Sequence, residues 1–159
     1  TSFASDRFSA HYLTNIIGNP LDTTVAMHYL IFGGVLERYP DLKFVLSHGG
    51  AFAAAYAGRM DHAYGARPDC RENISMPPSF YLEKFYPDSL VFTIEQLQYL
   101  INRFGADHVL IGTDYPFDMG EYDPVEHVYQ VPGLSSANRD LICGGNALRL
   151  MHMTEDECK

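Results

Sequence analysis

Apolar and polar residues along this chain repeat with two periods, one typical of helices and one typical of short buried strands. Helical spacing over residues 23–38 puts four apolar side chains on one face, namely Val25, Tyr29, Phe32 and Leu36. Asp22 is expected to cap this helix, and Pro40 follows its end. The run Phe44-Val45-Leu46 predicts a buried strand, and the Ala-rich segment 51–63 predicts a close-packed helix.

The same order of strand and helix returns further along the chain. Residues 65–78 contain three prolines and predict a loop. A second strand is expected over residues 85–91, around Asp88, although Pro87 lies inside it. Thr93 should cap a helix that Gly105 ends, because the apolar positions between them keep helical spacing: Leu97, Leu100, Ile101 and Phe104.

The remainder of the chain predicts one more strand and two short helices. Val109-Leu110-Ile111 is the third expected strand, and residues 116–133 are expected to form a loop. Helices are expected around Leu141 and Leu148, separated by Gly144-Gly145. Alternating strands and helices favour an α/β fold with a parallel sheet, and 159 residues predict one domain over 1–159.

Charge and composition narrow the class of protein. The 20 acidic and 11 basic residues give a formal net charge of −9, which disfavours nucleic acid or an anionic membrane as a partner. No stretch is apolar enough to span a membrane and no export signal opens the chain, so a cytoplasmic location is expected. The three cysteines lack metal-site spacing and are expected to be reduced thiols, with Cys143 buried: Cys70, Cys143 and Cys158.

His48 is the first candidate site residue, because it follows an expected strand and stands before Gly49-Gly50. An imidazole there can act as an acid, a base or a metal ligand. The two glycines allow close approach of the backbone, and their amides could hold an anion at the start of the next helix. The alternative is a core histidine with a satisfied hydrogen bond. Position and glycines together favour the functional interpretation.

Asp114 is the second candidate, because it follows the third expected strand in Gly112-Thr113-Asp114-Tyr115-Pro116. A carboxylate at a strand end can bind a divalent cation or orient a water molecule, with Tyr115 and Pro116 shielding the site. It could instead cap a local turn. The separation of 114 − 48 = 66 residues corresponds to about two βα units, so we expect both residues on one rim of the sheet.

These motifs, in this order, resemble the C-terminal part of the amidohydrolase-2 family. The resemblance rests on Leu46-Ser47-His48-Gly49-Gly50, Gly58-Arg59, Phe85-Tyr86-Pro87-Asp88, Gly112-Thr113-Asp114-Tyr115-Pro116-Phe117 and Gly145-Asn146-Ala147. It covers about residues 19–150 and is strongest to the decarboxylase branch, which includes aminocarboxymuconate-semialdehyde decarboxylases.

The resemblance implies a TIM-barrel enzyme with one divalent metal, zinc first and manganese second, at the C-terminal face of the strands. It implies that Asp114 is a metal ligand and that His48, on the sixth strand, is the acid or base. It also implies that Arg59 binds a substrate carboxylate, in some members across a homodimer interface. The bidentate geometry of a guanidinium suits that role, although Arg59 could equally be a solvated helix residue.

The chain departs from the family in lacking any His-x-His or Glu-x-His pair, which members carry on the first strand. A full barrel needs about 250 residues, so the chain is expected to hold strands six to eight of a longer enzyme. Since a catalytic zinc site takes three protein ligands, this chain alone is expected to bind metal weakly and to be inactive.

The expected reaction of the intact enzyme is non-oxidative decarboxylation of a small unsaturated or aromatic carboxylate. His48 would protonate the carbon that loses carbon dioxide, and Arg59 would hold a carboxylate. Two alternatives remain open: metal-dependent hydrolysis of a lactone or amide, and a non-catalytic partial barrel that pairs with another chain through exposed strand edges.

Overall fold

Most of the residues that the computed structural model describes, 7–158 apart from the side chains of Glu155 and Cys158, are helical or lie in turns. The chain divides into two compact units, Thr1–Phe85 and Tyr86–Lys159. Within the described residues, no helix is long and apolar enough to cross a membrane.

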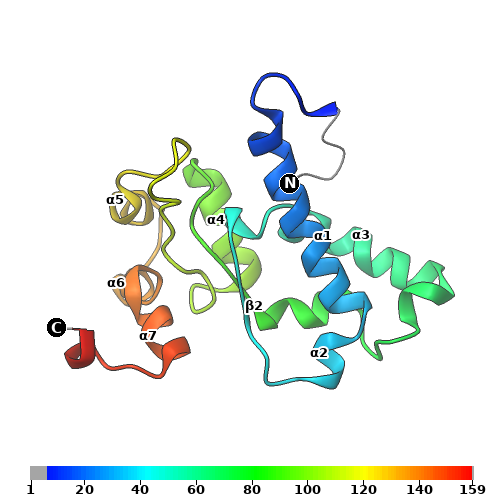
Figure 1. Cartoon of the computed structure of the whole chain (residues 1–159). Helices are drawn as coiled ribbons and strands as arrows, with labels where there is room; N and C mark the ends of the chain where they lie inside the picture. The colour runs from blue at the N-terminus through cyan, green and yellow to red at the C-terminus, as the bar shows by residue number, and fades with distance from the viewer. Residues whose placement is uncertain (1–6, 159) are drawn as a thin grey trace. The chain divides into compact units, whose positions relative to one another are not determined.

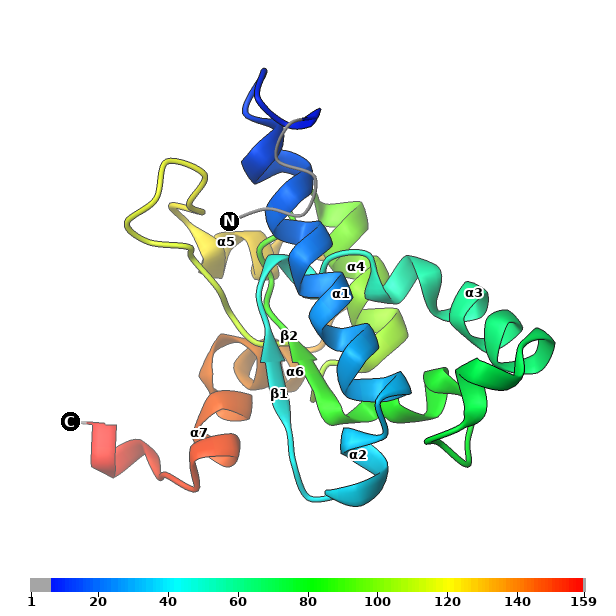
Figure 2. The same cartoon turned by 45° about the vertical axis from the view of Figure 1, so that its right-hand side comes forward.

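The first unit begins with a helical path that one glycine pair interrupts (Figure 1). A π-helical turn, η2 (Thr14–Gly18), continues directly into α1 (Asn19–Phe32), and α2 (Val35–Arg38) follows after Gly33-Gly34. Figure 2 shows α1, α2 and then β1 in succession. Gly34 has a φ of 69°, a left-handed conformation that breaks the helix and that glycine adopts at little cost.

The expected single helix over residues 23–38 is therefore wrong at its start and in its continuity, because Gly33-Gly34 divides it into α1 and α2, and correct only at its end, Arg38. Pro20 lies in the first turn of α1, where its missing N–H costs no hydrogen bond, so the helix extends past it. Asp22 lies in that first turn and is not the N-cap.

The rest of the first unit follows the predicted order. β1 (Phe44–Leu46) leads into a short 3-10 turn, η3 (His48–Gly50), and α3 (Ala53–Ala66) replaces the expected helix over 51–63. The expected loop contains one 3-10 turn, η4 (Pro68–Arg71), and a second, η5 (Pro78–Lys84), follows it. The expectation of a strand buried on both faces is wrong, because the side chain of Val45 is 62% exposed.

The core of the first unit joins α1, β1 and α3. Its side chains are nearly inaccessible to solvent, and the largest include Met27, Ile31, Leu46, Met60 and Phe85. The rings of Phe44 and Phe85 lie 5.8 Å apart. Glu37 ties α2 to the long loop by accepting hydrogen bonds from the Ser75 hydroxyl, at 2.6 Å, and from the Tyr81 hydroxyl. These two hydroxyl donors, that of Ser75 first, lower the pKa of Glu37.

The second unit contains more helix than the sequence predicts. β2 (Phe85–Pro87) begins with the last residue of the first unit, and α4 (Ile94–Phe104) follows with the predicted cap, since Thr93 Oγ1 accepts the Gln96 amide at 3.2 Å. The expected strand over 109–111 is reduced to one parallel bridge between Asp88 and Leu110.

The expected loop over residues 116–133 is wrong in part, because it contains α5 (Pro124–Tyr129). Asp123 caps this helix and Pro124 occupies its first position, a start signal that is visible in the sequence. The elements at the end of the chain are α6 (Ser136–Asp140), the π-helical turn η6 (Leu141–Gly145), α7 (Asn146–Met151) and η7 (Glu155–Cys158). The helix expected around Leu148 is confirmed, whereas Leu141 and the two expected separating glycines lie in η6, which joins α6 to α7 and in which Gly144 has a non-helical backbone.

Cysteine chemistry is partly as expected. Cys70 and Cys143 are free thiols and both are half-buried, so the expected full burial of Cys143 is wrong. Burial, and after it the charge of Asp140, raises the pKa of Cys143, which keeps the thiol protonated. The side chain of Cys158 lies outside the described part.

Asn146 organises the core of the second unit. Its side chain has no exposed surface, and its amide nitrogen donates to the backbone oxygens of Ala106 and Val109, both at 2.8 Å. Its Oδ1 accepts from Arg149 at 3.3 Å. The buried amide thereby links α7 to the segment that leads to Asp114.

We predict that Asn146→Ala lowers the free energy of unfolding by about 2–4 kcal/mol, because the buried Val109 carbonyl and the part-buried Ala106 carbonyl lose their donor. Urea denaturation of the chain measures the change. Asn102→Ala is the matched control, because Asn102 is exposed on α4, and it should alter stability by about 0.5 kcal/mol or less. Equal effects of the two substitutions would contradict this role for Asn146.

Candidate functional site

The segment after β1 is a run of four residues with positive φ angles, of which Ala51 has a ψ of −121°. The φ angles of His48, Gly49, Gly50 and Ala51 are 60°, 62°, 69° and 53°. For the two non-glycine residues this conformation costs about 1 kcal/mol or more each, and it persists only where surrounding contacts hold it. This run turns the chain sharply between the strand and α3.

Two threonines of α1 hold this turn from the side. Thr23 Oγ1 lies 3.1 Å from His48 Nδ1. Thr24 Oγ1 accepts the backbone N–H of Phe52 at 3.1 Å and donates to the Pro20 carbonyl at 2.8 Å. Helix α1 therefore fixes the imidazole of His48 and the chain that follows it.

The Gly50 amide is not available to bind an anion, the role that the sequence suggests for it. Gly50 N–H donates to the Ser47 carbonyl at 3.1 Å, and the next amide, of Ala51, donates to the His48 carbonyl at 2.8 Å. Both glycines are buried. The expectation that the Gly50 amide is available to an anion is wrong, because the turn itself uses it.

Arg59 lies on the exposed side of α3. Together with His28, Tyr56 and Met60 it lines a groove of about 310 Å³ in the first unit. Among the described residues, its guanidinium has no hydrogen-bond or ion-pair partner. The cation is therefore available to an external carboxylate.

Asp114 lies in the second unit, in a loop that the backbone closes tightly. Its φ is 55° and its side chain is half-buried. Its carbonyl accepts the Phe117 amide at 2.9 Å, and Thr113 on its other side accepts the Glu121 amide at 2.8 Å. Among the described residues, the Asp114 carboxylate has no hydrogen-bond or ion-pair partner, so its oxygens are available to a cation.

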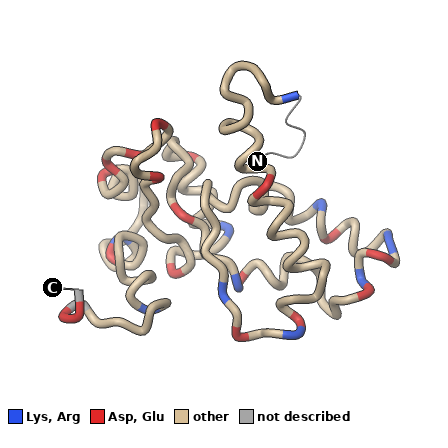
Figure 3. Tube along the Cα trace, in the orientation of Figure 1, with Lys and Arg blue, Asp and Glu red and all other residues tan. Residues whose placement is uncertain are grey.

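The expected shield around Asp114 is wrong for this chain. Tyr115 is 85% exposed and Pro116 is exposed as well. Figure 3 shows the acidic character of this loop, in which residues 114–126 include five acidic residues and no Lys or Arg: Asp114, Asp118, Glu121, Asp123 and Glu126. This charge favours a cation near Asp114.

The backbone before Asp114 is set by Asp88 and Ser89. Gly112 N–H donates to the buried Ser89 Oγ at 3.1 Å. A Cβ on Gly112 would lie 2.7 Å from the Asp88 Cβ, closer than packing allows. Only glycine fits here, which explains the glycine two residues before Asp114.

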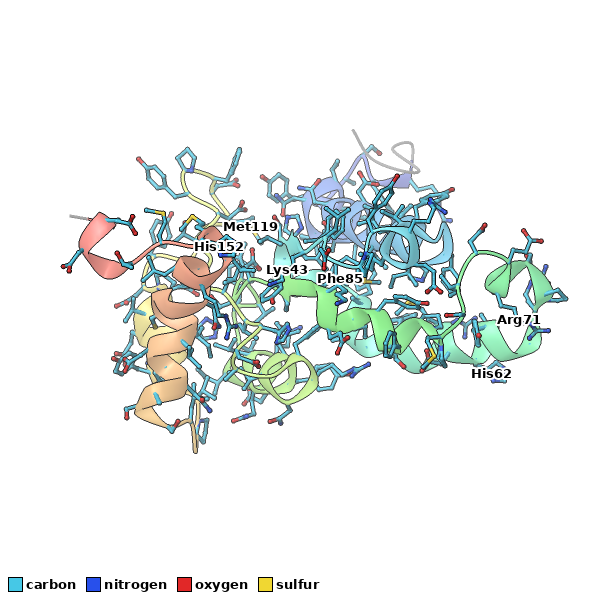
Figure 4. All side chains as sticks on the ribbon, turned by 90° about the horizontal axis from the view of Figure 1, so that it is seen from below. Lys43, His62, Arg71, Phe85, Met119 and His152 are labelled. Carbon is cyan, nitrogen blue, oxygen red and sulfur yellow. The ribbon has the colours of Figure 1, made fainter. Side chains whose placement is uncertain are left out.

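Three further histidines lie in packed or surface positions. His108 stacks on Tyr86 with ring centroids 4.6 Å apart, and His127 is buried beside Glu121. In Figure 4, His62 lies on the outside of the α3 segment, and it is exposed. Within the described residues, no group of three or more His, Cys, Asp or Glu side chains could hold a metal ion. Asp114 thus fits one position of a metal site, and the described residues do not complete the set.

Sequence reasoning missed the two threonines. Thr23 and Thr24 are β-branched hydroxyl residues inside a predicted helix, where their propensity is poor. That mismatch was the available signal that their hydroxyls serve a contact outside the helix.

The family of this chain follows from its sequence. The model of the amidohydrolase family matches residues 11–152, so the chain belongs to that family. A 2-amino-3-carboxymuconate-6-semialdehyde decarboxylase of Dictyostelium discoideum is 38% identical over 147 residues, which cover 92% of this chain and 41% of the relative.

Solved structures of decarboxylases share the fold. The 5-carboxyvanillate decarboxylase of Sphingomonas paucimobilis has a TM-score of 0.83 at 25% identity, covering 95% of this chain and 46% of that one. A dihydroxybenzoic acid decarboxylase of Polaromonas, solved with bound manganese and the inhibitor 2-nitroresorcinol, has a TM-score of 0.78 at 24% identity, covering 94% and 47%. The chain therefore spans less than half the length of each relative.

We predict that Gly112→Ala lowers the free energy of unfolding by about 1–3 kcal/mol, because the added methyl group overlaps the Asp88 side chain. Gly58→Ala is the matched control. Its Cβ would meet nothing within 4 Å on α3, and removing a helical glycine should raise stability by up to about 1 kcal/mol. Thermal or urea unfolding of both variants measures the difference. A neutral Gly112→Ala would rule out the close packing against Asp88.

Proposed function

We propose that this chain is the C-terminal portion of a metal-dependent enzyme that removes carbon dioxide, without oxidation, from a small unsaturated or aromatic carboxylate. In this proposal it forms one domain with the preceding part of the enzyme and contributes barrel strands six to eight. The observation that supports it most is the backbone conformation of His48 and Asp114 together with their available polar atoms. Each is held in a left-handed turn behind a strand or bridge residue, and each has polar atoms without a partner among the described residues.

Asp114 is the proposed metal ligand. Its free carboxylate and the acidic loop around it suit a divalent cation. Manganese and zinc are both compatible with a carboxylate ligand, and the manganese in the Polaromonas relative favours manganese. The remaining ligands would come from the part of the enzyme outside this chain. The metal would orient and polarise the substrate.

Arg59 is the proposed carboxylate binder and His48 the proposed proton donor. The guanidinium can grip a substrate carboxylate with two parallel hydrogen bonds. As the bond between the substrate carbon and its carboxylate breaks, carbon dioxide leaves and the electron pair stays on that carbon. The carbon then takes a proton from the His48 imidazolium, which regains one from solvent.

The intact enzyme is further proposed to be a homodimer in the cytoplasm.

The test is product analysis with the intact enzyme that carries this chain, supplied with manganese and a panel of aromatic and unsaturated carboxylates. Release of carbon dioxide or bicarbonate from a substrate without a hydrolysable bond is expected. His48→Asn should lower kcat by about 10²–10⁴-fold, since a positioned proton donor contributes that much. Arg59→Lys should act mainly by raising KM, because lysine lacks the planar fork.

His62→Asn is the matched control and should leave kcat and KM unchanged, because His62 is exposed on α3. Hydrolysis of a lactone or amide without release of carbon dioxide would replace the decarboxylase proposal by a hydrolase. A fully active His48→Asn variant would remove His48 from the reaction.

A further inference from the structure

Thr23 and His48 are joined by a contact that bears on which imidazole nitrogen can exchange a proton. Thr23 Oγ1 lies 3.1 Å from His48 Nδ1, and both side chains are half-buried. Among the described residues, this is the only hydrogen bond of the imidazole, so Nε2 has no partner there. One nitrogen is engaged with α1 and the other is available.

The geometry on both sides of this contact is constrained. Thr23 is fixed inside α1, between Asn19 and Phe32, and as a β-branched residue it has few χ1 rotamers. His48 is fixed by its left-handed backbone and by the Thr24–Phe52 hydrogen bond that follows it. The hydroxyl and Nδ1 are thus preorganised to meet, at no further entropic cost when a substrate binds.

The chemistry of proton donation selects the direction of this hydrogen bond. An imidazolium that donates from Nε2 must keep its proton on Nδ1 and ends as the Nδ1–H form. A hydroxyl oxygen opposite Nδ1 can accept that N–H in both states, so no rearrangement is needed between them. The hydroxyl proton of half-buried Thr23 can be directed to solvent.

We propose that Thr23 is a positioning residue that holds the proton of His48 on Nδ1, so that Nε2 is the nitrogen that exchanges a proton with the substrate. This inference rests on the acid role proposed for His48. It extends that role by assigning the tautomer and the residue that selects it.

The experiment is nitrogen-15 NMR of the histidine rings in the whole 159-residue chain, at about pH 8.5, where an ordinary imidazole is neutral. His48 is assigned by comparison with His48→Asn. We expect Nδ1 in the protonated range and Nε2 in the unprotonated range. In Thr23→Val the signals should move toward the Nε2–H form, which neutral histidine favours in water, whereas Thr23→Ser should keep the signals of the parent.

Control variants separate the loss of the Thr23 hydroxyl from a general loss of structural order in the chain. Thr14→Val removes an exposed hydroxyl that bonds to the Phe8 carbonyl, and it should leave the His48 signals unchanged. If Thr23→Val does not fold, Thr23→Ala removes the same hydroxyl without adding a methyl group. A parent chain with His48 in the Nε2–H form overturns the proposal, and so does an unchanged Nδ1–H form in the folded Thr23→Val or Thr23→Ala variant.

The result is independent of the proposed function. The tautomer is read without substrate or metal, so an Nδ1–H form lost with the Thr23 hydroxyl supports the positioning role even if no carbon dioxide is released. Conversely, the intact enzyme could release carbon dioxide while His48 is in the Nε2–H form. That result would support the proposed decarboxylase function and contradict the positioning role of Thr23.

Discussion

The run of positive φ angles from His48 to Ala51 is the constraint on which the first unit depends. Four consecutive residues hold φ angles near 60°, two of them without the freedom of glycine. The contacts from Thr23 and Thr24 stabilise that turn, and through it they set where α3 begins and where the imidazole lies. A strained backbone held by a neighbouring helix is a common way to keep a reactive side chain in one orientation.

In the second unit, close packing and buried polar groups hold the backbone that leads to Asp114. Asp114 also has a left-handed backbone, and the chain before it is fixed where Gly112 packs against Asp88 and bonds to Ser89. Asn146 connects α7 to the carbonyl groups of Ala106 and Val109. The packing of Gly112 and the hydrogen bonds of Asn146 thus hold the chain that leads to Asp114, the candidate metal ligand.

Much of this could be predicted from sequence, for reasons that are local. Periodicity and caps predicted α4 from Thr93 to Gly105, and a compact apolar run predicted β1. The start of α1 lies four residues before the predicted one, because Pro20 fits the first turn of the helix and Gly18, not Asp22, is the N-cap. Helix α5 lies in a segment predicted as a loop, although Asp123-Pro124 is a helix start signal. The link between Thr23 and His48 spans 25 residues and depends on tertiary packing, which no local pattern contains.

The central claim is that Asp114 binds the metal of a decarboxylase site that His48 serves. The most direct measurement is a crystal structure of the intact, manganese-loaded enzyme with anomalous diffraction at the manganese edge. The account predicts one anomalous peak within about 2.0–2.3 Å of an Asp114 carboxylate oxygen, a usual metal–carboxylate distance, with His48 Nε2 facing the same cavity. A manganese peak coordinated without Asp114, or His48 Nε2 facing away from it, would contradict the account.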